Sequence, residues 1–118
     1  MQQYPQVHEK MGSLLIGFAP VAGQTSEINL RIVLDFSEHG EVIGVEILNL
    51  VLETKNFGRR MIEQLTRDGG RVKSSYDEES DSLYLRLADA RSRDQRAMEG
   101  SLLFDVDGKL LRLSANWR

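Results

Sequence analysis

Residues 82–88 read Ser82-Leu83-Tyr84-Leu85-Arg86-Leu87-Ala88. The leucines alternate with Tyr84 and Arg86, and this period of two predicts a β-strand with one apolar and one wetter face. A related run, Ser13-Leu14-Leu15-Ile16-Gly17-Phe18-Ala19, lies 69 residues earlier in the chain. Two copies of one strand pattern at a fixed offset indicate a duplicated β-rich unit.

The duplication extends beyond these two runs, provided that one turn of the later copy is two residues shorter. The further aligned segments are residues 7–9 with 76–78, Leu34-Asp35-Phe36 with Phe104-Asp105-Val106, and residues 40–45 with 108–113. We therefore expect a single domain over residues 1–118, with repeat one at about residues 3–49 and repeat two at about residues 72–117.

Each repeat is predicted to contain four short strands. The expected strands are residues 3–7, 14–18, 29–36 and 42–48 in repeat one, and residues 72–76, 83–88, 102–106 and 110–115 in repeat two. Pro5 restricts the first strand to an edge position because it cannot donate a ladder hydrogen bond. Asp107-Gly108 is the strongest hairpin signal in the chain.

The segment between the repeats has a helical pattern. Leu50, Thr54, Phe57, Met61 and Leu65 recur at spacings of three and four residues, which predicts an amphipathic helix over about residues 50–68. Asn49 is the expected N-cap and Gly69-Gly70 the stop signal. The expected fold class is therefore α+β: two antiparallel four-stranded β-meander repeats that share a core, with one linker helix packed on the sheet.

Two motifs resemble the signatures of one family. Residues 76–87 resemble the opening signature of the bacterial domain-of-unknown-function family 2283, a run of the type Tyr-Asp-x-x-x-Asp-x-Leu-Tyr-Ile-x-Leu. Residues 34–48 resemble its closing signature, an aspartate and an acidic turn with glycine, then Val-Gly-Ile-Glu-Ile-Leu. The resemblance implies two diverged tandem copies of a small bacterial β-rich domain with no established activity.

Each repeat keeps a different end of this pattern. Repeat one has Val7 and His8 where the opening signature has Tyr-Asp, whereas repeat two has Arg112 and Ser114 where the closing signature has glycine and glutamate.

The composition is that of one ordinary globular domain. The chain has 118 residues, 41% of them hydrophobic, and 15 Lys+Arg against 18 Asp+Glu give a net charge of −3. The absence of cysteine excludes a disulfide scaffold, a thiolate metal site and a cysteine nucleophile. The N-terminus lacks a signal-peptide pattern and no apolar run could span a bilayer, so we expect a cytoplasmic protein that does not bind membranes.

No catalytic, metal-binding or cofactor-binding motif is recognised. The two histidines have no nucleophile beside them in any known arrangement. Asp35, Glu46 and Asp105 are the acids most suited to a candidate acidic cleft between the repeats, although a structural salt bridge would explain an inward acid equally well.

A candidate basic patch lies along the linker helix and its exit. It comprises Arg59, Arg60, Arg67 and Arg71. A solvated helix face is the ordinary meaning of such a patch, and contact with phosphate or an acidic partner is the alternative. Nucleic acid is not expected, because no aromatic side chains interleave with the arginines.

Together these features favour a non-enzymatic protein-binding or structural module that forms a homodimer or recognises a protein partner, for instance by strand addition. One alternative is a small-molecule or metal site, with weak enzymatic activity, in the acidic cleft. The other is binding of nucleic acid or an acidic partner through the basic helix face.

Overall fold

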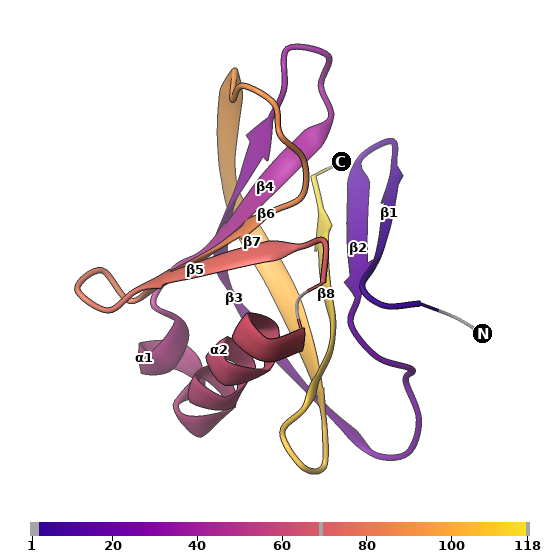
Figure 1. The fold of residues 1–118 in the computed structure, drawn as a ribbon, viewed down its shortest axis with the longest axis vertical. Coiled ribbons are helices and arrows are strands. Elements are labelled where there is room, and N and C mark those ends of the chain that lie inside the picture. Colours follow the sequence, from indigo (N-terminus) through magenta and orange to yellow (C-terminus); the bar gives the residue numbers. More distant parts are fainter. Residues whose placement is uncertain (1–2, 69, 118) are drawn as a thin grey trace.

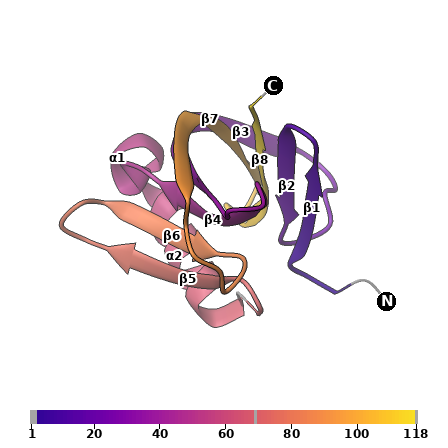
Figure 2. The same ribbon diagram turned by 90° about the horizontal axis from the view of Figure 1, so that it is seen from above.

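The computed structural model describes residues 3–68 and 70–117. It contains one antiparallel sheet of eight strands in the order β1-β2-β8-β7-β3-β4-β6-β5 (Figure 1). The strands are β1 Gln6–Lys10, β2 Ser13–Gly17, β3 Thr25–Phe36, β4 Val42–Ile47, β5 Lys73–Asp77, β6 Ser82–Arg86, β7 Asp94–Asp105 and β8 Leu110–Asn116. Seen from above, the sheet is strongly curled, with the β1–β2 and β5–β6 hairpins at its two ends (Figure 2).

The α+β class and the duplication into two sets of four strands are confirmed, but the strand order differs from two consecutive meanders. A meander would place β2 beside β3. Instead β2 pairs with β8, and β4 pairs with β6. Each four-stranded half of the sheet therefore takes one hairpin from each repeat. We call β3, β4, β6 and β5 half-sheet A, and β1, β2, β8 and β7 half-sheet B.

The two half-sheets are joined through the long strands β3 and β7. These strands pair along their whole length, from Thr25↔Asp105 to Phe36↔Asp94. Both are longer than predicted because their N-terminal ends carry polar, exposed residues that lack an apolar alternation. Each of these ends nevertheless pairs with the buried C-terminal end of the other strand. The first strand also differs from its expected range, residues 3–7, because β1 begins at Gln6, directly after Pro5.

The strand registers correct the alignment of the second hairpins. Phe36 pairs with Val42 after a β-bulge, and Phe104 pairs with Leu110 after an equivalent bulge. The structural counterpart of Asp35 is therefore Leu103, and not Asp105 as the sequence alignment had it.

The turns of these hairpins confirm the corrected register. The Ser37 N–H donates to the Glu41 carbonyl at 2.8 Å, and the Asp105 N–H donates to the Lys109 carbonyl at 3.0 Å. The two turns thus have equal length. The turns that differ are those of the first hairpins: the β5–β6 turn, residues 78–81, is two residues longer than the β1–β2 turn, residues 11–12. The sequence alignment was wrong here because aspartate is also a preferred turn residue, so Asp105 resembled Asp35 without occupying its place.

Two helices replace the single predicted linker helix. They are α1 Leu50–Thr54 and α2 Asn56–Asp68, separated by Lys55 at φ 55° and ψ −120°. Gly58 lies where α2 crosses α1, and a Cβ there would overlap the Thr54 hydroxyl. Of the predicted stop signal, Gly70 has a left-handed φ of 58°, while Gly69 lies outside the described residues.

One core contains side chains of both repeats and both helices. The helices lie against the same face of the curled sheet (Figure 1). Phe57 of α2 packs on Phe104 of β7 with ring centroids 4.8 Å apart, and Met61 is fully buried. In the described part of the chain, neither helix has the length and apolar character needed to cross a membrane.

Candidate functional site

A polar cluster lies on the outer face of half-sheet A, the face turned away from the helices. Asp35 of β3 is only 7% exposed. The Tyr84 hydroxyl of β6 donates to its Oδ2 at 2.8 Å, and the Gln95 amide of β7 donates to its Oδ1 at 2.6 Å. We call Asp35, Tyr84 and Gln95 the outer cluster.

The strand registers explain how three strands meet at one carboxylate. Gly44 of β4 pairs with Asp35 on one side and with Arg86 on the other. The Tyr84 ring lies across Gly44 to reach Asp35, and a Cβ at Gly44 would overlap the Tyr84 hydroxyl. Glycine is therefore required here by the close approach of the ring.

The electrostatics of the outer cluster keep Tyr84 as a hydrogen-bond donor. Burial raises the pKa of Tyr84 to about 12, aided by the hydrogen bond to Asp35 and by the charge of that carboxylate. Both oxygens of Asp35 are engaged. The cluster is thus a set of polar side chains from three strands that hydrogen-bond to one another at a single carboxylate.

Three cationic side chains flank the outer cluster. Arg71, Lys73 and Arg86 line one cavity of about 140 Å³. Lys73 stands directly opposite Arg86 on neighbouring strands, and the Arg86 guanidinium lies 5.8 Å from the centre of the Tyr84 ring. This places a positively charged concavity at the beginning of the edge strand β5.

Asp81, in the turn between β5 and β6, has a structural role that the sequence did not reveal. Its two carboxylate oxygens accept the N–H groups of Val51 and Leu52 at 2.9 Å, and its Oδ1 also accepts the Tyr76 hydroxyl at 2.6 Å. The expected N-cap Asn49 makes no side-chain capping bond. The opening signature of repeat two therefore caps the helix that follows repeat one.

The same contacts set the ionisation of this pair. Burial opposes the charge on Asp81, but the hydrogen bonds from Tyr76, Val51 and Leu52 outweigh it and lower the pKa of the carboxyl. The hydrogen bond to Asp81, followed by burial, raises the pKa of Tyr76 to about 12. Asp81 is therefore an anion at neutral pH and Tyr76 a neutral donor.

The three acids of the predicted cleft do not lie together. Asp35 and Glu46 are both on the outer face of half-sheet A, and their charges both act on Tyr84. Asp105 pairs with Thr25, ten residues along β3 from Asp35, which is roughly 30 Å at about 3.3 Å per residue. Its carboxylate accepts the N–H groups of Asp107 and Lys109 within the turn.

The predicted basic patch is divided among three places. Arg60 donates to the Asp107 carbonyl at 2.5 Å and shares a cavity with Arg67. Arg59 lines a different cavity, beside Tyr76. Arg71 lies beyond the helix and lines a cavity with Lys73 and Arg86, which are not among the four arginines of the predicted patch.

Half-sheet B lacks the outer cluster at the equivalent positions. Arg112 of β8 lies between Leu103 and Gly17, in the place that Gly44 takes between Asp35 and Arg86, and Leu15 takes the place of Tyr84. Leu103 forms a small apolar cluster with Ala19 and Leu111. The closing signature of repeat one (residues 34–48) and the opening signature of repeat two (residues 76–87) thus meet in half-sheet A. This meeting is visible only once the strand order is known.

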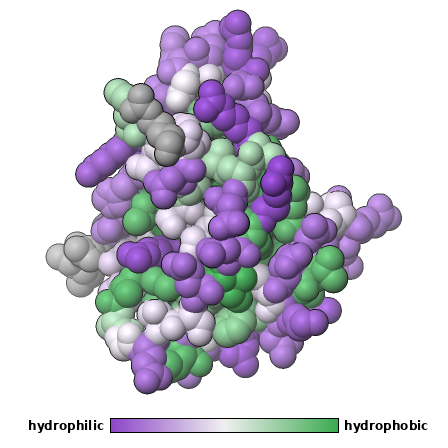
Figure 3. Space-filling model, turned by 180° about the vertical axis from the view of Figure 1, so that it is seen from behind, coloured by the Kyte–Doolittle hydropathy of each residue, from purple (hydrophilic) through white to green (hydrophobic). Residues whose placement is uncertain are grey.

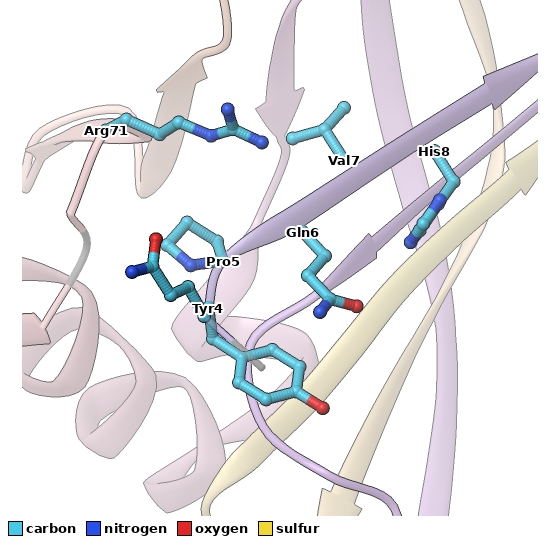
Figure 4. A pocket seen from close by; sticks show the side chains of 7 residues that line it. Tyr4, Pro5, Gln6, Val7, His8 and Arg71 are labelled. Atoms are coloured by element: carbon cyan, nitrogen blue, oxygen red, sulfur yellow. The ribbon is translucent and has the colours of Figure 1, made fainter. Parts of the chain in front are cut away.

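Two other features offer less chemistry. Residues 3–8 and Arg71 line a cavity of about 530 Å³, but Tyr4 and Gln6 point away from Arg71 (Figure 4).

The most exposed large apolar side chains come from four separate segments; they are Met11, Val21, Leu52 and Val106. Seen from behind, polar groups interrupt the apolar areas (Figure 3). Within residues 3–68 and 70–117, no three histidine or acidic side chains could hold a metal ion together.

Comparison with known proteins identifies the family. The family model described as "Protein of unknown function (DUF2283)" matches residues 13–50 and residues 73–112, which together are more than half of the chain. The first match contains β2, β3 and β4, and the second contains β5, β6, β7 and the start of β8. No curated protein and no solved structure matches the chain. The chain therefore belongs to the DUF2283 family, as two tandem copies of its domain.

Proposed function

We propose that this protein is a non-enzymatic binding module that recognises a protein partner with the outer face of half-sheet A. The observation that carries this proposal is the asymmetry of the two half-sheets. One has on its outer face a buried aspartate that accepts hydrogen bonds from Tyr84 and Gln95, and the other has apolar or unrelated residues at the same positions. Since both halves fold into the same sheet, the fold itself does not require the cluster.

The chemistry of the outer cluster supports binding over catalysis. Tyr84 holds its proton at neutral pH, and both Asp35 oxygens accept hydrogen bonds from the protein. A preorganised surface of this kind loses little side-chain entropy when a partner binds.

The surroundings of the cluster support a protein as the partner. Tyr84 and Arg86 pair an aromatic ring with a guanidinium, and these residue types are enriched where interfaces derive most of their binding energy. β5 is an edge strand of the sheet, so its outer backbone groups are available for an added strand. The polar surface suits a non-obligate complex, in which both partners also exist alone.

The test is capture of partners from native extract by tagged protein, with two matched charge reversals. Arg86→Glu changes the outer face of half-sheet A, and Arg112→Glu makes the same change on half-sheet B. We expect a stoichiometric partner with the wild type and with Arg112→Glu, and its loss with Arg86→Glu. A partner that both variants retain would contradict the assignment of the face, and no stoichiometric partner at all would contradict the binding function.

A further inference from the structure

We propose that Arg71, Lys73 and Arg86 form a binding site for an oxyanion, that is, a phosphate or carboxylate group. The site deepens the proposed function, on which it rests, by giving the chemical group that anchors a partner on half-sheet A. It lies where the loop after α2 enters β5, next to Arg86 at the end of β6.

The cavity has a suitable size and lining for such a group. Its volume is about 140 Å³, several times the about 30 Å³ that a water molecule occupies in the liquid, so the space is of the order of a small oxyanion. Arg71, Lys73 and Arg86 supply the charge, and Leu87 and Ala88 supply an apolar wall. Guanidinium groups bind carboxylate and phosphate in a two-pronged geometry that an ammonium group then reinforces as a point charge.

The positive charge of this cavity is poorly compensated by the protein. Lys73 and Arg86 are direct cross-strand partners, an arrangement that destabilises a sheet when the charges are alike. The one acid on the cavity wall, Asp89, is fully exposed and lies 3.8 Å from Arg86, so water screens their attraction. In the described part of the chain, neither Arg71 nor Lys73 has an ion pair.

Half-sheet B provides an internal comparison for this arrangement. Gln6 pairs with Gly17 in β1 and β2 as Lys73 pairs with Arg86 in β5 and β6. Tyr4, two residues before Gln6, packs toward Gly17 and stands where Arg71 stands before Lys73. The three equivalent positions therefore carry no charge, although Arg112 lies beside Gly17 on the neighbouring strand, and the β1–β2 hairpin forms without cations at these three positions.

A lysine on an edge strand also discourages unwanted pairing between sheets. That role accounts for Lys73 alone. It does not account for Arg71 or Arg86, which project into the same cavity from the preceding loop and from the neighbouring inner strand. The convergence of three cations from two neighbouring stretches of chain, residues 71–73 and β6, is explained by an anionic ligand.

The test is titration of the full chain, labelled with ¹⁵N, with inorganic phosphate at constant ionic strength. We expect saturable shifts of the Arg71, Lys73 and Arg86 backbone amides and of the arginine Nε–H signals. Arg86→Gln and Lys73→Gln should each weaken the fitted affinity about tenfold, which is the loss of one charge-assisted contact. Arg91→Gln removes the same charge from a different cavity and should leave the affinity unchanged.

A second titration identifies the source of the oxyanion, using an acetylated peptide of alternating threonine and glutamate. Shifts that start at Arg71 and continue along β5 would assign the group to a side chain of an added strand, whereas a response to phosphate alone would assign it to a phosphate. No saturable shift with either probe, or equal weakening by Arg91→Gln, would overturn the site. If the site fails in this way but a partner is still captured and depends on Arg86, the proposed function is retained and only the oxyanion site is wrong. If phosphate binds but no partner is captured, the oxyanion site is retained and only the proposed function is wrong.

Discussion

At the scale of single residues, Asp81 shows how a signature residue can be structural. It caps α1 from a distant part of the chain and also holds Tyr76. We expect Asp81→Ala to lower the free energy of unfolding by about 1–2 kcal/mol, the usual cost of losing an N-cap. Urea unfolding measures this change. Asp77→Ala, which removes an acceptor only from an exposed turn amide, is the control and should change stability by less than about 0.5 kcal/mol.

The ionisation of Asp81 makes part of this stability depend on pH. Because the folded-state pKa is lowered, the advantage of the carboxylate over an amide is present above the unfolded pKa, about 3.9. It is lost as the pH falls through the folded pKa. The difference in stability between wild type and Asp81→Asn should therefore shrink in acid, and a difference that stays constant there would contradict the capping role of the charge.

Tyr76 and Tyr84 give the opposite dependence at high pH. Both have a pKa raised to about 12, against about 10 in the unfolded chain. Their contribution is complete below pH 10 and is lost as the pH rises through 12. We expect stability to fall over this window, and less steeply for Tyr84→Phe, when thermal unfolding is followed by circular dichroism. An equal slope in both proteins would contradict the raised pKa of Tyr84, which burial and the hydrogen bond to Asp35 cause together.

Gly44 tests the outer cluster itself. A methyl group at this position would collide with the Tyr84 ring, so Gly44→Ala should destabilise the protein by about 1–3 kcal/mol, the cost of overpacking. Leu15 stands in the place of Tyr84 in half-sheet B, beside Arg112. Tyr84→Leu should therefore remove most of the penalty of Gly44→Ala in a double-mutant cycle. Strictly additive changes in unfolding free energy would contradict the contact.

At the scale of elements, the sequence was informative where side-chain pattern determines structure. The alternation of Leu83 and Leu85 with Tyr84 and Arg86 placed β6 correctly, and both leucines are buried. The break between α1 and α2 was missed because Thr54 and Phe57 keep the apolar spacing across it. Gly58 was the available signal, since a glycine inside a helix often permits the close backbone approach found here.

Pairing partners were beyond prediction for a different reason. Hydrophobic pattern fixes which face of a strand is buried, but β2 could bury the same face beside β3 or beside β8. The outer cluster depends on that choice, because Asp35, Tyr84 and Gln95 come from strands of both repeats. Asp35 and Glu46 could therefore be singled out from the sequence, whereas Tyr84 and Gln95 could not.

The helix break also makes a prediction at this scale. Lys55 has φ 55° and ψ −120°, a conformation that costs a non-glycine residue about 1–3 kcal/mol, and its side chain is exposed. Lys55→Gly should remove this cost in the folded state. The glycine also makes the unfolded chain more flexible, which lowers the free energy of unfolding by about 0.4–1 kcal/mol. We expect a net stabilisation of about 1 kcal/mol in urea unfolding. Lys55→Ala is the control, and an equal gain there would show that the backbone conformation is not the cause.

At the scale of the whole molecule, the exchange of hairpins makes the two repeats inseparable. β3 and β7 form the longest pairing in the sheet, and each half-sheet requires strands from both repeats. The core cluster likewise draws its buried residues from both. A single repeat would leave β3 or β7 as a long unpaired edge and would expose half of its apolar face to water.

We therefore predict that neither repeat folds alone and that the two fold on mixing. Fragments 1–55 and 56–118 divide the chain at the exposed break between α1 and α2. Each fragment alone should give the circular dichroism of an unfolded chain. An equimolar mixture should recover the spectrum of the intact protein and give a one-to-one complex by native mass spectrometry. Ile32→Asp should weaken the affinity between the fragments, because Ile32 is fully buried where β3 pairs with β7. Covalent linkage supplies a high effective concentration in the intact chain, so the fragments should need a much higher concentration to reach the same stability. A fragment that folds as a stable monomer would contradict the interdependence of the repeats, because the exchanged strand order allows neither repeat to complete a half-sheet by itself.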